Sequence, residues 1–342
     1  MQTEAFVLTQ TGAAKTAFQR QEISIGAPKS AEVLIEVEAF GLNYADVMAR
    51  LGLYREAPPM PCVLGYELVG KIIEVGENAP PELLGKRVLA FTRFGAYAKH
   101  AITRSDAVQE IPVQMHAAQA LPFATQGVTA YYMTDILAPI QPNDKVLVHA
   151  AAGGVGSFLI QLARLRGATV IASTGSDHKF PYIESLGAQH VINYKKHDYQ
   201  DQVKAILGGH ALDVAYNPIG AKSAKTDLNL LGPGGRLFLF GGSELANRKG
   251  LLGKLKFLWE MGILLPIGLM MQSKNILGVN MLKLADAHPL LIKNSMAELF
   301  SLYEQKKLQL PAIKIYKAAD FFQAHDALGA GLTTGKLVIE WD

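Results

Sequence analysis

A glycine-rich turn between a short apolar run and an amphipathic segment is the stretch of this sequence with the clearest chemical meaning. Residues 145–156 read KVLVHAAAGGVG and continue into SFLIQLAR at 157–164. Small residues in such a turn let backbone N–H groups approach a pyrophosphate at a helix N-terminus. The spacing fits the G-x-G-x-x-G fingerprint if Ala151 replaces the first glycine. The sequence therefore predicts a dinucleotide-binding turn, the alternative being a tight turn without a ligand. The predicted contact residues are Gly153, Gly154, Val155 and Gly156.

The end of the next predicted strand, residues 169–174, indicates which nicotinamide dinucleotide suits this site. An NAD site usually presents Asp or Glu there, which accepts hydrogen bonds from the ribose diol. Here the strand end reads Ser173-Thr-Gly-Ser176, and the first carboxylate is Asp177. Hydroxyl groups and cations suit a 2′-phosphate, and Lys179 follows closely. We therefore expect Ser176 and Lys179 to favour NADPH over NADH, although Lys179 has the alternative role of a solvated helix residue.

Cysteine and histidine usage predicts that the protein holds no metal. Cys62 is the single cysteine, which excludes an internal disulfide framework and any multi-cysteine metal site. The nine histidines are scattered and form no i,i+4 pair. His149, beside the glycine turn, is interpreted as a packing residue at a strand end.

Composition is that of an ordinary globular protein. The chain has 342 residues, of which 49% are hydrophobic and 18% charged, and two domains are expected at this length. The net charge is +3 and the signs are dispersed, so no nucleic-acid partner is expected. No signal or transit peptide is expected at the N-terminus, and the predicted location is the cytoplasm.

The predicted elements divide the chain into a β-rich part and an alternating part. Residues 1–122 contain strand candidates at 33–39, 68–75 and 87–91. Further strand candidates at 145–150, 169–174, 190–193, 212–216 and 236–241 alternate with helix candidates at 155–166, 178–187, 198–207 and 222–232. Such alternation predicts an α/β fold with a doubly wound parallel sheet. Candidate elements at the C-terminal end are a sixth strand at 276–280, a long helix at 286–307, a helix at 321–328 and a strand at 336–341, which returns to the β-rich part.

One apolar segment has no evident place in this scheme. Residues 257–271 are strongly apolar and follow four cations, Arg248, Lys249, Lys254 and Lys256. This run is shorter than the ~20 residues that cross a bilayer, so no transmembrane span is expected. It has three interpretations: a lid or oligomer contact, core packing, or a basic interfacial helix that gives peripheral membrane contact. We favour the first two, because apolar stretches of soluble folds are usually buried against protein.

Ordered short motifs extend over essentially the whole chain. They are GLNYAD at 41–46, GLY at 52–54, GYE at 65–67, GAYA at 95–98, AAAGGVG at 150–156, GA at 187–188 with VINY at 191–194, and TGK at 334–336. By these motifs the chain resembles the medium-chain dehydrogenase/reductase superfamily. It is most similar to the zinc-free quinone oxidoreductase and zeta-crystallin branch, which includes homologues of the vesicle amine transport protein. Residues 45–54 and the apolar insert after Gly242 are similar to the vesicle-protein subgroup.

The resemblance implies a fold and a set of domains. It implies a Rossmann domain at 123–282 that binds NADPH, inserted in a GroES-like substrate and catalytic domain at 1–122 and 283–342. Asp46 stands where zinc-dependent relatives carry cysteine, and Tyr66 stands where they carry histidine, so the resemblance implies a site without zinc. It also implies a homodimer, for which 274–281 offers an edge strand.

Further cofactor contacts are implied residue by residue. Tyr194 matches a tyrosine that helps to hold the 2′-phosphate, with packing as the alternative. Thr129 resembles a threonine close to the nicotinamide. Asn217 ends a strand where the family often shows Asp-x-x-Gly, and Phe240 and Gly241 end another strand. Each of these glycine-containing ends is equally compatible with a simple turn.

The implied reaction is hydride transfer from NADPH to a quinone or an α,β-unsaturated carbonyl. Without a metal, hydrogen-bond donors must stabilise the charge on the acceptor oxygen. Asn43 and Tyr54 are the candidates, from segments that face the cleft in the family. Asn43 is expected to fix the nicotinamide or the substrate, and Tyr54 to orient the oxygen, relay a proton or only shape the cleft. The alternative function is an NADPH-binding protein that acts through membrane or protein partners, with little turnover.

Overall fold

The chain divides into two compact units. The computed structural model describes residues 1–248, 250–262 and 265–341. The α/β unit consists of Thr129–Asn280 with Lys307–Gln309, and the β-rich unit consists of Met1–Val128, Met281–Lys306 and the chain from Leu310 onward.

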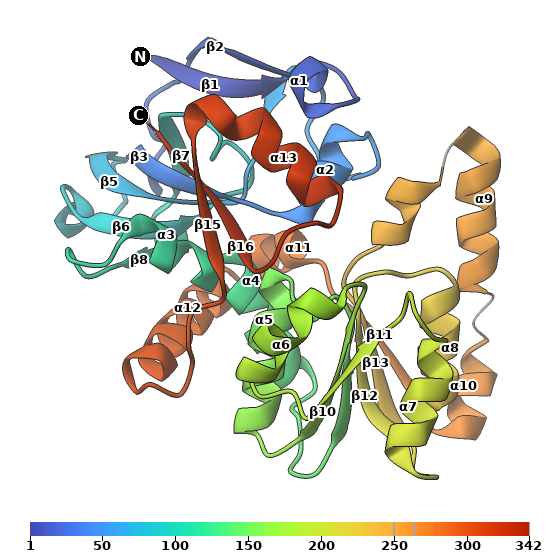
Figure 1. The fold of residues 1–342 in the computed structure, drawn as a ribbon. Coiled ribbons are helices and arrows are strands. Elements are labelled where there is room, and N and C mark those ends of the chain that lie inside the picture. Colours follow the sequence, from blue (N-terminus) through green and yellow to red (C-terminus); the bar gives the residue numbers. More distant parts are fainter. Residues whose placement is uncertain (249, 263–264, 342) are drawn as a thin grey trace. The chain divides into compact units, whose positions relative to one another are not determined.

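The α/β unit is built on a six-stranded sheet in the order β11-β10-β9-β12-β13-β14 (Figure 1). All five strand pairs are parallel. The strands are β9 (Lys145–Val148), β10 (Thr169–Thr174), β11 (His190–Asn193), β12 (Leu212–Asn217), β13 (Leu231–Leu239) and β14 (Asn275–Gly278). The chain winds outward from β9 to β11 and then outward again from β12 to β14. This is a doubly wound sheet, and its topological switch point lies between β9 and β12, where such sheets hold ligands at the carboxyl ends of the strands.

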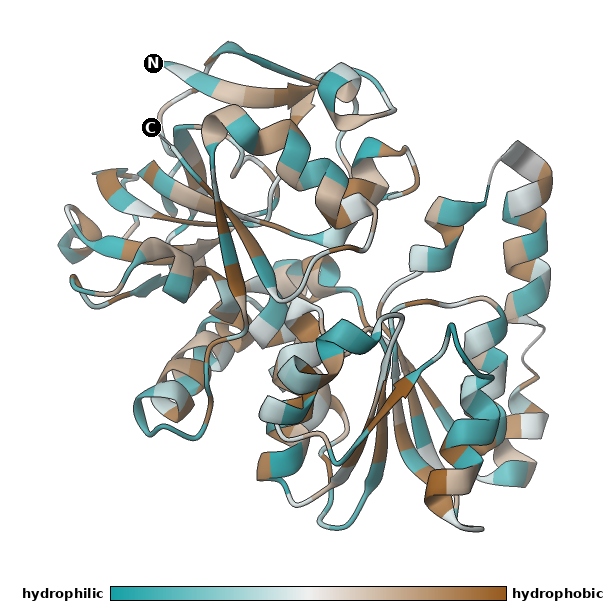
Figure 2. Cartoon of the chain, viewed as in Figure 1, coloured by the Kyte–Doolittle hydropathy of each residue, from teal (hydrophilic) through white to brown (hydrophobic). Residues whose placement is uncertain are grey.

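Four helices connect these strands: α5 (Gly154–Leu165), α6 (Phe180–Ser185), α7 (Tyr199–Leu207) and α8 (Lys222–Leu230). Their apolar sides pack on the sheet, because the strands of a parallel sheet are covered on both faces. Leu147, Ile171 and Ala215 of three strands form one buried cluster with Val203 of α7 and Leu230 of α8. In Figure 2 polar residues dominate the outer sides of α7 and α8.

Several boundaries differ from the sequence-based prediction, three of them for reasons visible in the sequence. Strand β13 begins at Leu231, so the helix predicted to 232 ends two residues earlier, at Leu230. Helix α6 begins at Phe180 because Pro181 occupies its first turn, and a short 3₁₀ turn, Asp177–Lys179, precedes it. The long helix predicted at 286–307 is two helices, α11 (Met281–Ala287) and α12 (Pro289–Glu304). Pro289 separates them, since proline is tolerated in a first turn but not in a helix interior.

The β-rich unit contains two sheets (Figure 1). One has the order β2-β1-β4, and the other has the order β15-β16-β3-β5-β6-β8, with β7 paired to β3. The strands are β1 (Gln2–Leu8), β2 (Phe18–Ser24), β3 (Glu32–Leu42), β4 (Cys62–Val63), β5 (Glu67–Val75), β6 (Arg87–Phe91), β7 (His100–Arg104), β8 (Val108–Glu110), β15 (Ile313–Lys317) and β16 (Lys336–Glu340). Strand β16 pairs antiparallel with β3, so the C-terminal segment completes the sheet that the N-terminal segment begins.

An aromatic cluster fills the core of the β-rich unit. The rings of Phe6 and Phe321 stack with their centroids 4.0 Å apart. Phe40 and Tyr97 pack beside them, with centroids 4.8 Å apart. The remaining helices are α1 (Ala14–Ala17), α2 (Tyr44–Arg50), α3 (Ala117–Ala120), α13 (Phe321–Gly329) and α4 (Thr125–Tyr131), the last of which crosses the boundary between the units.

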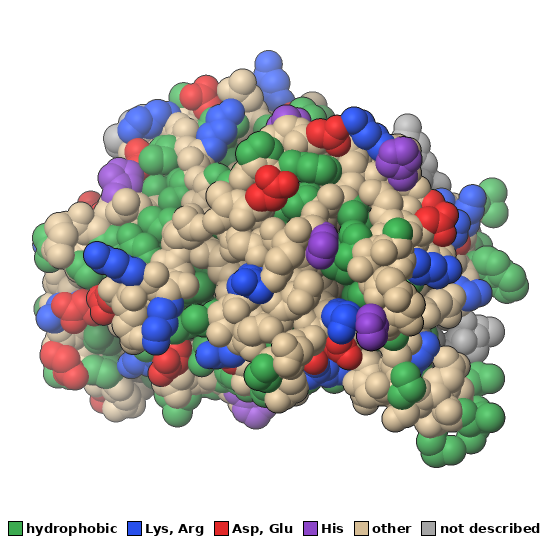
Figure 3. Space-filling model, turned by 60° about the horizontal axis from the view of Figure 1, so that its bottom comes forward, with side chains coloured by type: hydrophobic (Ala, Val, Ile, Leu, Met, Phe, Trp, Pro, Cys, Tyr) green, Lys and Arg blue, Asp and Glu red, His purple; other side chains and the backbone are tan. Residues whose placement is uncertain are grey.

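The apolar segment forms two helices that are not buried. These are α9 (Gly250–Met261) and α10 (Pro266–Gln272); residues 249, 263 and 264 of the predicted segment lie outside the described residues. Leu252, Trp259 and Met271 are 82%, 83% and 80% exposed, so core packing is the wrong interpretation for this surface. Figure 3 shows hydrophobic side chains projecting at the right-hand edge, where α9 and α10 lie. By length and composition alone, the 21 residues Leu252–Gln272, with a mean hydropathy of 1.2, could cross a membrane once as a helix. One such stretch is weak evidence of a membrane span.

Candidate functional site

The glycine turn after β9 has the geometry of an anion-binding helix start. Helix α5 begins at Gly154, and Gly153 is its N-cap in extended backbone (φ −79°, ψ 173°) without a side-chain cap. Its first N–H groups are therefore not occupied by a capping side chain, and the helix dipole favours negative charge there. A dinucleotide pyrophosphate matches both features.

Two close approaches explain the small residues of the turn. A Cβ atom on Gly156 would lie 2.6 Å from the carbonyl oxygen of Ala150 and 2.8 Å from Cα of Ala151, so only glycine fits. On Gly153 the corresponding distance to the Ala150 oxygen is 3.2 Å. Ala151 is fully buried, and its N–H donates to the Ser173 carbonyl at 3.1 Å, which ties the turn to β10. Alanine therefore suffices where the fingerprint has its first glycine.

The turn after β10 lies against a tyrosine and a lysine that directly follow β11. A Cβ atom on Gly175 would lie 2.8 Å from the Tyr194 hydroxyl oxygen and 3.1 Å from Cε of Lys195. Lys179 is buried, and its pKa is lowered by burial and by the positive charge of Lys195. An anion placed between these ammonium groups would relieve both costs. Lys195 was not predicted from the sequence, although it directly follows Tyr194.

The carboxylate nearest to this turn is already neutralised. Asp177 accepts a hydrogen bond from Nδ2 of Asn193 at 2.5 Å and forms an ion pair with Lys196. The pKa of Asp177 is lowered by these two contacts, that with Lys196 first. The predicted residue Ser176 caps the 3₁₀ turn, because its carbonyl accepts from the Lys179 N–H at 3.2 Å. The end of β10 therefore presents cations and hydroxyls and no unpaired carboxylate.

The turns after β12 and β13 contact each other. A Cβ atom on Gly241 would lie 2.7 Å from the Pro218 carbonyl oxygen, and the Phe240 N–H donates to the Asn217 carbonyl at 3.3 Å. The Asn217 side chain is used inside its own turn, where Oδ1 accepts from the N–H groups of Ile219 and Gly220 at 2.8 and 2.9 Å. A contact between this turn and a cofactor would therefore involve its backbone.

We call the four turns after β9, β10, β11 and β12 the strand-end site. It consists of residues 149–156, 175–179, 194–195 and 217–221, all within the α/β unit. The structure thus brings the predicted Ser176, Lys179 and Tyr194 together at one turn. Thr129, also predicted, is buried in α4.

In the β-rich unit, Asn43 belongs to a fully buried polar cluster. Its Oδ1 accepts from Nζ of Lys336 at 3.1 Å, and its Nδ2 donates to Oε1 of Glu67 at 3.0 Å. Lys336 and Glu67 are both 0% exposed and form an ion pair with each other. The Thr125 N–H donates to the second Glu67 oxygen at 2.7 Å. The Asn43 amide is therefore satisfied internally, by one residue of the GYE motif and one of the TGK motif.

Asp46 completes this buried cluster of Asn43, Asp46, Glu67 and Lys336. It is fully buried and accepts from the backbone N–H groups of Asn43 and Gly65, at 2.9 and 3.2 Å. Burial raises the pKa of Asp46 to about 7, although the hydrogen bond from Asn43 opposes the rise. No group of three or more His, Cys, Asp or Glu side chains among the described residues is arranged to hold a metal ion.

Tyr54 and Tyr66 form an edge-to-face pair near this cluster, with ring centroids 6.3 Å apart. Burial, and secondarily Glu56, raises the pKa of Tyr54 to about 12. The pKa of Tyr66 is raised further, by burial and by Asp46. Both phenols are therefore protonated at neutral pH and act as hydrogen-bond donors, not as bases.

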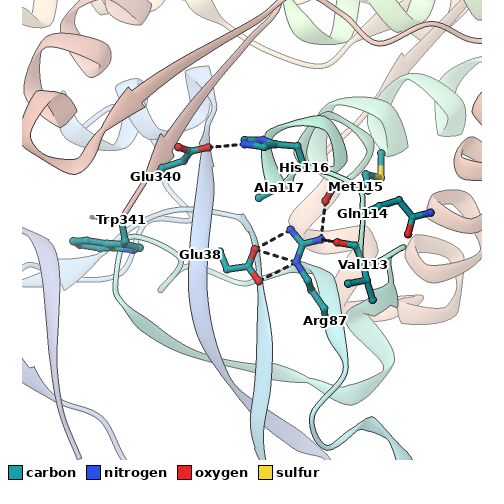
Figure 4. Close-up of a pocket in the computed structure, with 9 residues that line it drawn as sticks. All are labelled: Glu38, Arg87, Val113, Gln114, Met115, His116, Ala117, Glu340 and Trp341. Atoms are coloured by element: carbon teal, nitrogen blue, oxygen red, sulfur yellow. Dashed lines mark hydrogen bonds and ion pairs between the residues drawn. The ribbon is translucent and has the colours of Figure 1, made fainter.

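A pocket of about 410 Å³ opens elsewhere on the β-rich unit (Figure 4). Its charged groups are paired with one another: Arg87 with Glu38 at 2.8 Å, and His116 with Glu340 at 3.5 Å. None of the predicted site residues lines this pocket.

Comparisons with known proteins place these features in a family. Residues 29–135 match the family model described as "Alcohol dehydrogenase GroES-like domain", and residues 154–294 match "Zinc-binding dehydrogenase". The human synaptic vesicle membrane protein VAT-1 homolog is 30% identical over 293 residues, which are 85% of this chain and 74% of that protein. The zebrafish (Danio rerio) homolog is 31% identical over 292 residues, 84% of this chain, and the chain spans only 60% of its length.

Solved structures agree with this placement. The Escherichia coli quinone oxidoreductase complexed with NADPH has a TM-score of 0.86 and 26% identity, covering 98% of this chain and 99% of that chain. CurK enoyl reductase has a TM-score of 0.84 and 26% identity, covering 99% of both chains. This chain therefore belongs to the medium-chain dehydrogenase/reductase superfamily, in the branch of the quinone oxidoreductases and VAT-1 homologues.

Proposed function

We propose that this protein is an NADPH-dependent, zinc-independent oxidoreductase that reduces a quinone or an α,β-unsaturated carbonyl. The observation that carries the proposal is the end of β10, where Tyr194 and Lys195 lie against Gly175, Lys195 is close enough to lower the pKa of Lys179, and the nearby Asp177 is paired. A 2′-phosphate fits that setting better than a ribose diol does. The similarity to a quinone oxidoreductase bound to NADPH and to an enoyl reductase supports both the cofactor and the acceptor class.

The strand-end site has the donors that NADPH requires. The uncapped N–H groups at the start of α5 bind the pyrophosphate, and Gly156 allows the close packing that this position needs. Lys179 and Lys195 bind the 2′-phosphate, with Tyr194 over the same turn. When bound, NADPH supplies a hydride from C4 of its nicotinamide.

On the acceptor side, Tyr54 is the proposed hydrogen-bond donor. Its raised pKa keeps the phenol proton on Oη at neutral pH, so Tyr54 can donate a hydrogen bond to an acceptor oxygen as charge develops. Asn43 has both amide atoms committed to Lys336 and Glu67, and it acts by holding that cluster rigid. Tyr66 stands where a histidine ligand would be, and the Asp46 carboxylate accepts from the N–H groups of Asn43 and Gly65, which supports zinc independence.

A spectrophotometric assay tests this function. NADPH oxidation is followed at 340 nm against a panel of quinones and enones, with NADH in parallel and with added Zn²⁺ or a chelator as separate arms. We expect turnover of at least one acceptor class, a preference for NADPH, and no effect of either metal arm. Bound NADPH without turnover of any acceptor contradicts the proposed reaction.

The exposed helices α9 and α10 favour a second function, which is docking on an anionic membrane surface. Trp259, Leu258 and Met270 are 83%, 63% and 70% exposed, and Lys254 and Lys256 lie on the same helix as the first two. Apolar and aromatic side chains beside lysines are typical of helices that lie in a bilayer interface. Basic residues near a bilayer are attracted by anionic lipids.

Sedimentation with phosphatidylserine vesicles tests this second function. The wild-type chain is compared with Leu258→Glu/Trp259→Glu and with Val113→Glu, a matched change at an exposed apolar residue (85%) of the β-rich unit. We expect only the α9 variant to lose sedimentation. Equal sedimentation of all three chains, or none with any of them, removes this function.

A further inference from the structure

A buried carboxylate at the switch point of the α/β sheet is not used by the proposed reaction. Asp227 of α8 is 0% exposed, and three donors converge on it. Nε2 of His149 lies 3.0 and 3.1 Å from its two oxygens, the Tyr199 hydroxyl lies 3.0 Å away, and Nδ2 of Asn217 lies 2.5 Å away. Burying a carboxylate without partners costs several kcal/mol, so three donors are needed to keep it there.

Two of the three donors come from turns in the strand-end site, and the third, Tyr199, begins α7. His149 directly follows β9 and precedes Ala150, whose φ of 49° starts the glycine turn in the left-handed region. Asn217 is the last residue of β12, and its Oδ1 holds the N–H groups of Ile219 and Gly220. Asp227 therefore connects the turn after β9 to the turn after β12 through two side chains. The interpretation of His149 as a packing residue is incomplete, because the ring also makes this hydrogen bond.

The charge of Asp227 is what allows it to serve both turns. A carboxylate accepts from all three groups at once, whereas an asparagine has one acceptor oxygen and an NH₂ group, so at least one of His149, Tyr199 and Asn217 must change its hydrogen bond. Because each of these groups comes from a different element, that rearrangement would shift one turn relative to the other. The two turns lie at the ends of adjacent strands, where a dinucleotide crosses the sheet.

We propose that Asp227 is a positioning residue for NADPH, acting through His149 and Asn217 to hold the turns after β9 and β12 at the spacing that the dinucleotide requires. The proposal rests on the proposed function, since it needs NADPH to bind at the strand-end site. It adds to that function a group that touches neither cofactor nor substrate. Removal of its charge weakens cofactor binding while leaving the step at saturating cofactor nearly unchanged.

The test compares Asp227→Asn with a matched variant in the same sheet, Asp144→Asn. Asp144 lies just before β9, at the opposite end of that strand, where it accepts from the Gln141 N–H at 2.8 Å and pairs with Arg236. For each full-length variant, the Kd for NADPH is measured by fluorescence titration. The kcat and the KM for NADPH are measured with the best acceptor at saturation, and Tm is measured by calorimetry. For Asp227→Asn we expect the Kd and KM for NADPH to rise about tenfold or more, with kcat within about twofold. For Asp144→Asn we expect a lower Tm with an unchanged Kd.

His149 variants keep the proposal testable if Asp227→Asn does not fold. His149→Gln retains an N–H donor, and His149→Leu does not, so the Gln variant should keep most of the NADPH affinity that the Leu variant loses. Equal NADPH affinity in the wild type and in Asp227→Asn, or in the two His149 variants, overturns the positioning role. Failure of the wild type itself to bind NADPH contradicts the proposed function instead.

Discussion

Two polar regions of this protein differ in where their hydrogen-bonding groups point. In the strand-end site, the start of α5 has no capping side chain. The pKa of Lys179 there is lowered by burial and by the nearby charge of Lys195. In the buried cluster, Lys336, Glu67 and Asn43 satisfy one another inside the β-rich unit. The N–H groups at the start of α5 thus have no capping side chain, whereas the polar side chains of the buried cluster are paired with one another. A polar residue that sequence similarity places in an active site can therefore serve either purpose, and its partners decide which.

The largest expected effect is on the stability of the buried cluster. Lys336→Met leaves Glu67 buried without its cation, which costs about 3–5 kcal/mol of unfolding free energy. Lys317→Met is the matched control, because Lys317 pairs with Glu340 at 3.3 Å while 60% exposed and should cost under about 1 kcal/mol. Urea unfolding measures both. Similar losses in the two variants would show that the buried pair is not the special case described here.

A pH dependence of stability is expected from the same cluster. Asp46 has a pKa of about 7 in the folded protein, against 3.8 for an exposed aspartate, so the folded protein holds this proton to higher pH. Stability from this group is therefore full below about pH 4 and is lost as the pH rises to 7, by at most about 1.4 kcal/mol per unit.

The measurement is urea unfolding of the wild type and Asp46→Asn at several pH values between 4 and 8. The stability of the wild type relative to the variant should fall as the pH rises through that range. A difference that is constant with pH would mean that Asp46 does not titrate there.

The next effect concerns the glycine turn of the strand-end site. Gly156→Ala places a Cβ atom 2.6 Å from the Ala150 carbonyl oxygen, and relief of that overlap moves the turn or α5. Overpacking of about 1–3 kcal/mol should weaken NADPH binding roughly tenfold to a hundredfold. Gly268→Ala in α10 is the control, since a Cβ there meets nothing within 4 Å. Isothermal titration calorimetry measures the Kd for NADPH of each variant. Wild-type affinity in both variants would show that the close approach at Gly156 does not matter for NADPH binding.

The smallest expected effect is on the preference for NADPH over NADH when Lys179 or Lys195 is replaced. Lys179→Ala and Lys195→Ala should each raise the Kd for NADPH several-fold to about tenfold, without changing the Kd for NADH, because only the 2′-phosphate is lost. Lys204→Ala, at an exposed position of α7, should leave the ratio of the two affinities unchanged. If Lys204→Ala changes the ratio as much as the other two, the 2′-phosphate lies elsewhere.

The fold was largely predictable from sequence because its signals are local. Alternating strand and helix patterns and the glycine turn after β9 each lie within a few dozen residues, and the doubly wound sheet is confirmed. The break in the helix predicted at 286–307 is also a local feature, because Pro289 begins α12 and cannot continue α11.

The polar partners were not predictable in the same way. Lys336 meets Asn43 across 293 positions, and Asp227 meets His149 across 78, and no spacing rule joins such pairs. The position of Lys195 beside the end of β10 depends on the pairing of β10 with β11, which the sequence around Lys195 does not show. The exposure of α9 and α10 likewise depends on tertiary structure, since the same apolar residues would be typical of a buried core helix.

A direct comparison of NADPH and NADH affinity for the wild-type chain tests the central claim most simply. Nicotinamide fluorescence is titrated with protein under identical buffer and salt, for each dinucleotide separately. The end of β10, where Asp177 is paired and Lys195 lies against Gly175, predicts that NADPH binds at least about tenfold more tightly than NADH. Equal affinity, or tighter binding of NADH, would contradict it.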